Sequence, residues 1–296
     1  MGSRGHRAPA AKPSMSYGTI LVDLSLDEGS DAAVRAAATL ARSHGSHLVG
    51  VAATGTVDTE FSWAASRSLH EANGARDAAA LLASRRAERF HELCRALHLP
   101  SFEAVAIEGD RASVLLHRSL ACDVTVIGQA GIEREDRHTV EHVLLHNARP
   151  TLLVPPAGAG AKVGGAIGER ILVAWDDSAA CARAVGDAMP LLRRAREVHL
   201  RIWLPASEAR GSAHTAVQVR LAEIAPWLSR QGVRVQAEVE HAEHAVGDEI
   251  MRAAARLESD LIVMGTYSHS RWTERLLGGA TRTALHRAVI PLWMTH

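Results

Sequence analysis

The chain has 296 residues, of which 47% are hydrophobic and 22% are charged, and its formal net charge is zero. This length suits two domains that each bury a core, and the composition is that of a soluble globular protein. A balanced charge excludes the basic field that attracts nucleic acid or an anionic membrane, and no apolar run approaches the roughly 18 residues of a membrane-spanning helix.

The amino-terminal segment and the cysteines indicate the compartment. Residues 1–16 are rich in Gly, Ala, Arg and Pro and lack the apolar stretch of a signal peptide, so we expect a flexible segment. The sequence has three cysteines, Cys94, Cys122 and Cys181, and no CxxC pair. An odd number of cysteines without such a pair fits free thiols in a reducing compartment. The sequence therefore predicts a cytoplasmic protein.

Strands alternate with helices along residues 17–156. Apolar runs predict strands, and apolar residues at 3–4 spacing predict helices. In chain order we expect strand 17–25, helix 31–43, strand 48–51, helix 75–97, strand 102–107, helix 114–120, strand 124–127, helix 140–146 and strand 150–154.

A Gly/Ala-rich linker, residues 157–168, separates this domain from a second one over residues 169–296. The same order of elements then returns. We expect strand 170–175, helix 178–194, strand 198–204, helix 215–231, strand 233–239, helix 246–256, strand 260–264, helix 279–287 and strand 291–295.

The two domains share sequence features as well as element order. The run from Asp123 to Gly128 recurs from Asp260 to Gly265, with an apolar stretch ending in Gly at the same offset. Alternating strands and helices form right-handed βαβ crossovers around a parallel sheet. We therefore predict the same α/β fold in both halves, each with five parallel strands in the order 3-2-1-4-5.

The candidate binding residues follow strands of the second domain. Ligands of such sheets lie beyond the carboxyl ends of the strands, which places Asp176 beside Gly265. Gly278 and Gly279 precede a predicted helix whose first turn has unpaired N–H groups, an arrangement that can hold phosphate. Further donors in this stretch are Ser268, Ser270, Arg271 and Thr281. An equally weighted alternative is that the glycines only turn the chain between strand and helix.

These residues resemble the universal stress protein family over almost the whole chain after residue 17. Nucleotide-binding members carry Gly, two residues, Gly, nine residues, and Gly followed by Ser or Thr. Gly265 and Gly278 match the first and third glycines, whereas Ser268 replaces the second and Gly279 replaces the Ser or Thr. In that family an Asp at the end of the first strand contacts adenosine, and Asp176 matches it. The resemblance implies two flavodoxin-like domains and ATP or another adenine nucleotide, with Mg²⁺ compatible, in the second.

The first domain departs further from the family pattern. Ser25 stands where Asp176 stands in the second domain, with Asp23 and Asp27 close by, and no Gly pair precedes its last helix. We expect this domain to be degenerate and to serve as a structural or regulatory partner. The resemblance also implies an intramolecular pseudo-dimer, paired through strands 151–155 and 291–295. A homodimer of the chain is compatible with the sequence, and a downstream protein partner is not indicated.

Three functions from different classes remain open. The leading one is a regulatory protein that binds an adenine nucleotide; the others are a scaffold that uses the fold for dimerisation and a slow ATP hydrolase. No GxSxG, HExxH or P-loop motif is present, so no catalytic residues are predicted. His138, His142 and His146 recur at four-residue spacing, but three residues in line rarely converge on one ion, so we expect no metal site.

Overall fold

The computed structural model describes residues 16–25, 30–55, 69–129, 134–156, 167–208, 211–266 and 277–296. The first half comprises β1 (Thr19–Asp23), α1 (Ser30–His44), β2 (His47–Ala53), α2 (Leu69–Ala96), β3 (Phe102–Ile107), α3 (Arg111–Ser119), β4 (Val124–Gly128), α4 (Arg134–His146) and β5 (Thr151–Val154). The second half comprises β6 (Arg170–Ala174), α5 (Ala179–Asp187), α6 (Met189–Leu192), β7 (Glu197–Pro205), η2 (Ala206–Glu208), α7 (Ser212–Arg230), β8 (Val235–Ala242), α8 (Val246–Arg256), β9 (Leu261–Gly265), α9 (Leu277–Arg287) and β10 (Leu292–Thr295).

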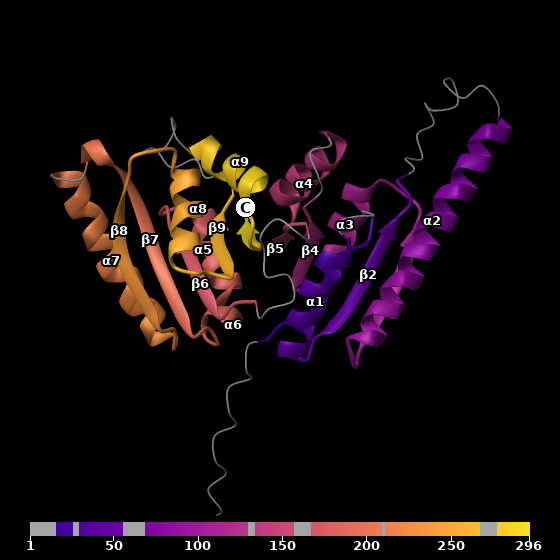
Figure 1. The fold of residues 1–296 in the computed structure, drawn as a ribbon, viewed down its shortest axis with the longest axis horizontal. Helices are drawn as coiled ribbons and strands as arrows, with labels where there is room; N and C mark the ends of the chain where they lie inside the picture. Colours follow the sequence, from indigo (N-terminus) through magenta and orange to yellow (C-terminus); the bar gives the residue numbers. More distant parts are fainter. Residues whose placement is uncertain are drawn as a thin grey trace, which may run out of the picture.

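A single ten-stranded sheet runs through both halves, in the order β3-β2-β1-β4-β5-β10-β9-β6-β7-β8 (Figure 1). Counted within each half, that order is 3-2-1-4-5, and all pairs inside a half are parallel. The halves join where β5 and β10 pair antiparallel, with Leu152 opposite Trp293. The predicted α/β class is confirmed, and the two expected five-stranded sheets are continuous with each other.

Helices cover both faces of the sheet, because successive strand residues point to opposite sides. Ile20 and Val22 face one apolar core with α1, α2, α5, α6 and α7, whereas Leu21 faces the other with α3, α4, α8 and α9. Both cores contain residues of both halves, so the interior is continuous across the β5–β10 seam. None of the described helices is both long and apolar enough to cross a membrane.

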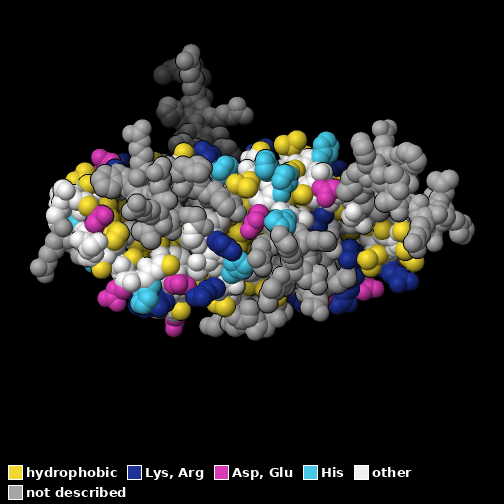
Figure 2. Space-filling view, turned by 90° about the horizontal axis from the view of Figure 1, so that it is seen from above, with side chains coloured by type: hydrophobic (Ala, Val, Ile, Leu, Met, Phe, Trp, Pro, Cys, Tyr) yellow, Lys and Arg dark blue, Asp and Glu magenta, His cyan; other side chains and the backbone are white. Residues whose placement is uncertain are grey.

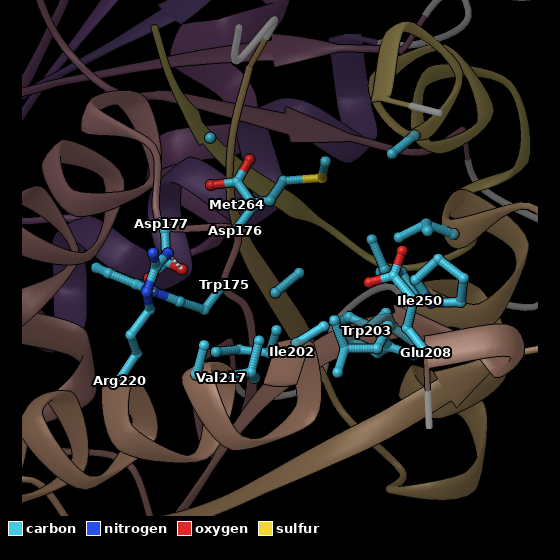
Figure 3. Close-up of a pocket in the computed structure, with 18 of the residues that line it drawn as sticks. Trp175, Asp176, Asp177, Ile202, Trp203, Glu208, Val217, Arg220, Ile250 and Met264 are labelled. Atoms are coloured by element: carbon cyan, nitrogen blue, oxygen red, sulfur yellow. Dashed lines mark hydrogen bonds and ion pairs between the residues drawn. The ribbon is translucent and has the colours of Figure 1, made fainter. Parts of the chain in front are cut away.

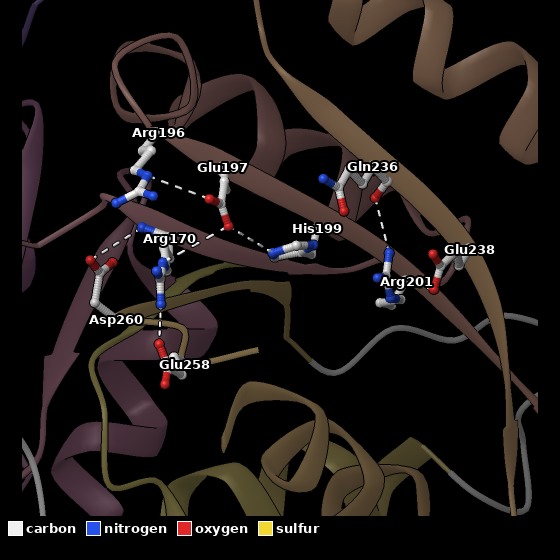
Figure 4. A network of polar contacts seen from close by, with 9 residues as sticks. All are labelled: Arg170, Arg196, Glu197, His199, Arg201, Gln236, Glu238, Glu258 and Asp260. Carbon is white, nitrogen blue, oxygen red and sulfur yellow. Dashed lines mark hydrogen bonds and ion pairs between the residues drawn. The ribbon is translucent and has the colours of Figure 1, made fainter. Parts of the chain in front are cut away.

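The repeated aspartates act as structural acceptors at the amino ends of the first strands. Asp123 Oδ2 accepts hydrogen bonds from the backbone N–H groups of Gly18 and Thr19, at 2.7 and 3.0 Å. Asp260 accepts in the same way from the three residues 168–170, within a wider polar network that includes the Arg170–Glu258 ion pair (Figure 4). The repeat of this residue in the sequence therefore reflects the fold.

One predicted element is divided in the structure. The expected helix 178–194 is two helices, α5 and α6, because Pro190 lies in the first turn of α6 and has no N–H to continue the α5 ladder. Other helices start earlier than predicted, notably α2, α4 and α9. The predicted amino-terminal segment 1–16 and linker 157–168 lie almost entirely outside the described residues.

Aromatic contacts reinforce the seam between the halves. The ring of Tyr17 lies 5.4 Å from that of Trp293 and 4.8 Å from that of His44, measured between centroids. The Tyr17 hydroxyl donates to the backbone oxygen of Asp187 at 2.8 Å. Burial raises the pKa of Tyr17, and the hydroxyl therefore stays protonated as a donor. Residues from β10, α1 and the end of α5 thus meet at one buried point.

Candidate functional site

A cleft of about 330 Å³ lies at the carboxyl ends of β6, β7 and β9 (Figure 3). Its floor is formed by the strand ends, and its walls come from α7, α8 and α9. The predicted site residues Asp176, Gly265 and Thr281 all line it. This is the edge of a parallel sheet at which ligands are expected, and the volume falls in the range of small-molecule sites.

The turn between β6 and α5 positions Asp176. Its Oδ1 accepts a hydrogen bond from the Ser178 N–H at 3.0 Å, which fixes the carboxylate in the turn. Ser178 in turn caps α5, since its hydroxyl accepts from the Cys181 N–H at 2.9 Å. The strand end and the helix cap together hold Asp176 at the cleft.

Asp177 links this turn to the opposite wall. Its backbone is left-handed, with φ of 61°, which is uncommon for a residue other than glycine. Its carboxylate accepts from the Trp175 indole N–H at 2.7 Å and forms an ion pair with Arg220 of α7 (Figure 3). These contacts compensate for the backbone strain and connect the β6–α5 turn with α7 across one end of the cleft.

The structure gives a reason for glycine at position 265 that does not involve a ligand. A Cβ at this position would lie 2.5 Å from the backbone nitrogen of Cys181, and 2.9 Å from the carbonyl carbon of Ala180. Glycine is therefore required for the close approach of β9 to the start of α5, whether or not a ligand is present. A Cβ at Gly279, by contrast, would meet no atom within 4 Å.

The remaining predicted residues lie at or near the start of α9. Gly278 and Gly279 belong to the first turn of this helix, which begins at Leu277, two residues earlier than expected. Thr281 is buried in the next turn and lines the cleft. Ser268, Ser270 and Arg271 lie outside the described residues.

Most of the cleft wall is apolar or aromatic and was not predicted. Trp175 and Trp203 come from the ends of β6 and β7, and Val217 comes from α7 (Figure 3). The sequence could have indicated Trp203 as a cleft residue, because it lies at the end of predicted strand 198–204 and ligands bind at the carboxyl ends of such strands. The α7 residues had no comparable signal. An apolar slot with carboxylates at Asp176 and Glu208 suits a planar group that carries hydrogen-bond donors.

Cys181 packs beneath the cleft without contributing a reactive thiol. Its side chain is fully buried, and the Sγ atom donates to the backbone oxygen of Ala174 at 3.3 Å. Burial raises the pKa of this thiol, which disfavours the nucleophilic thiolate. Cys94 and Cys122 are also free and buried.

Histidines gather on the surface near the middle of the molecule (Figure 2). On α4, His138, His142 and His146 are all exposed, and the rings of the last two lie 4.2 Å apart between centroids. Among the described residues, no group of three or more His, Cys, Asp or Glu side chains is arranged to hold a metal ion.

The fold is that of a tandem α/β protein of the doubly wound type, with a cleft at the carboxyl ends of its second set of strands. Residues 168–296 match the model of the Universal stress protein family. These residues therefore belong to the universal stress protein family, and the whole chain has the tandem arrangement of two such folds.

Solved structures share this arrangement over nearly the whole chain. A universal stress protein from Archaeoglobus fulgidus DSM 4304 is 15% identical, with a TM-score of 0.69, and the match covers 94% of this chain and 95% of that one. A putative universal stress protein from Pseudomonas aeruginosa UCBPP-PA14 is 14% identical, with a TM-score of 0.58 and coverages of 96% and 95%. At these identities the likeness shows the fold. Among curated proteins, no significant match to the chain was found.

Proposed function

We propose that the second half of the chain binds an adenine nucleotide and that the protein acts as a regulatory binding protein. The observation that carries this proposal is that Asp176, Gly265 and Thr281, predicted from separate parts of the sequence, line one cleft. That cleft lies within the residues that match the universal stress protein family. ATP and AMP are both compatible with the proposal.

Different parts of the described cleft suit the base and the phosphates of a nucleotide. The base is expected to occupy the apolar slot with Trp175 and Trp203, while the Asp176 carboxylate accepts hydrogen bonds from the nucleoside. The first turn of α9, with Gly278 and Gly279, would hold the phosphates through its unpaired N–H groups. Mg²⁺ would accompany the phosphates as a counter-ion of the nucleotide.

Binding rather than turnover is the proposed activity. The described cleft contains no lysine, and its Arg220 is paired with Asp177, so the described wall has no evident group to stabilise phosphoryl transfer. Steady phosphate release that is lost on substitution of Asp176 would instead indicate the slow hydrolase. The scaffold alternative predicts a folded protein with no nucleotide affinity.

The proposal is tested by calorimetric titration of the full chain with ATP and with AMP. Asp176→Ala should weaken binding at least tenfold, or about 1.4 kcal/mol, because the carboxylate acceptor is lost. Glu223→Ala removes an exposed carboxylate of α7 outside the cleft and should leave the affinity unchanged. No binding of either nucleotide by the wild-type chain would refute the proposal and favour the scaffold.

A further inference from the structure

The two halves differ at two matching positions beside the cleft. Alignment of residues 20–22 with 171–173, which occupy equivalent places in β1 and β6, makes Asp23 the counterpart of Ala174. The first residues of the equivalent helices α3 and α8 are Arg111 and Val246. Ala174 and Val246 both line the cleft of the second half. The first half therefore has a carboxylate and a guanidinium where the second half has small apolar cleft walls.

These two charged side chains are joined to each other inside the first half. Arg111 donates from Nε and Nη2 to Asp23 Oδ2, at 2.8 and 2.6 Å. Asp23 is 1% exposed and Arg111 is 8% exposed, so the pair is almost completely withdrawn from water. A buried guanidinium with a carboxylate partner is held firmly, because separating the charges in a low-dielectric interior is unfavourable.

The polar groups around the pair are also engaged internally. The second oxygen of Asp23, Oδ1, accepts from the Ser25 N–H at 2.9 Å. The hydroxyl of Ser25, the counterpart of Asp176, accepts from the Ala53 N–H at the end of β2, at 3.2 Å. Both oxygens of Asp23 and the Ser25 hydroxyl therefore have partners within the chain.

We propose that the Asp23–Arg111 pair closes the first half to ligand and so determines that one chain binds one nucleotide. The guanidinium stands where the second half leaves room beside Ala174 and Val246. A nucleotide could enter the first half only by displacing a buried ion pair. This inference rests on the proposed nucleotide binding of the second half and identifies the residues that restrict binding to that half.

The first test transfers the second half's residues into the first half. Asp23→Ala/Ser25→Asp/Arg111→Val removes the pair and supplies the counterpart of Asp176. The number of ATP molecules bound per chain, measured by equilibrium dialysis, should rise from one to two. Ser25→Asp alone keeps the pair and is the matched control, for which the number should stay at one. A folded triple variant that still binds one ATP would overturn the inference, as would two ATP molecules on the wild type.

A reciprocal variant keeps the inference testable if the triple variant does not fold. Ala174→Asp/Val246→Arg installs the same pair beside the second half's cleft and should weaken ATP binding at least tenfold. Glu223→Arg places a guanidinium on the exposed face of α7 outside the cleft, and its affinity should stay within threefold of the wild type. Unchanged affinity in a folded Ala174→Asp/Val246→Arg chain would contradict the inference. Absence of ATP binding by the wild type would instead count against the proposed function, so the two failures are distinguishable.

Discussion

At the scale of single residues, glycines that look alike in the sequence have different roles. Gly265 lies where β9 passes the start of α5, and a side chain there would meet backbone atoms at 2.5 and 2.9 Å. Those atoms belong to α5 and cannot move aside as the end of a flexible side chain can. Gly279 lies in the first turn of α9, is exposed, and has open space where a Cβ would stand.

We therefore expect opposite effects on stability from the same substitution. Gly265→Ala should lower the free energy of unfolding by about 1–3 kcal/mol, because the new methyl group overpacks the β9–α5 contact. Gly279→Ala should leave it unchanged or raise it by up to about 1 kcal/mol, because alanine favours the helix and restricts the unfolded chain. Urea denaturation of both variants measures the difference. Equal stabilities would show that β9 and α5 separate readily.

At the scale of elements, the Asp23–Arg111 pair connects β1 to α3 in the first half. The two residues are 88 positions apart, and each is buried among residues of the sheet and its covering helices. The favourable term is the attraction between the charges, and the opposing term is their loss of hydration. Removing one charge loses the attraction but leaves the other charge buried.

A double-mutant comparison separates these terms. Asp23→Ala should cost about 3–5 kcal/mol in the free energy of unfolding, because the buried Arg111 guanidinium loses the carboxylate to which it donates two hydrogen bonds. Asp23→Ala/Arg111→Val should recover most of that loss, since no buried charge remains. Urea denaturation of the two variants and the wild type gives the coupling. A double variant no more stable than Asp23→Ala would mean that the cost arises from lost packing and not from the charge.

At the scale of the whole molecule, the halves share one sheet and a buried aromatic contact. His44 of α1 contacts Tyr17, whose ring also contacts Trp293 of β10. Burial, together with the nearby Arg194 guanidinium, lowers the pKa of His44 from 6.5 to about 4. The neutral form of His44 is therefore the one that fits the folded seam.

This lowered pKa predicts a loss of stability in mild acid. The unfolded chain binds a proton at His44 near pH 6.5, whereas the folded chain binds it only near pH 4. Stability should consequently fall as the pH is lowered through this window and should be independent of His44 above it. Melting temperatures between pH 7 and 4 should fall less steeply for His44→Phe than for the wild type. Parallel profiles for the two proteins would assign the acid sensitivity to other groups.

Local sequence patterns determined the class of fold and part of the site. Apolar runs alternating with amphipathic segments predicted the parallel α/β halves, because crossover connections constrain the direction of successive strands. The same rule placed Asp176 and Gly265 at neighbouring strand ends, and the structure has both at one cleft. The repeated Asp123 and Asp260 are conspicuous in the sequence because they perform the same backbone-binding task in each half.

Only the tertiary structure decided which side chains complete or close the clefts. Trp203 and Val217 face the second half's cleft because α7 packs beside β7, and Arg111 meets Asp23 because α3 packs against β1. The two halves differ at these positions by single residues that satisfy the same local pattern of strand end or helix start. Whether such a residue forms a wall or fills a cleft depends on contacts between distant parts of the chain, for which local periodicity carries no signal.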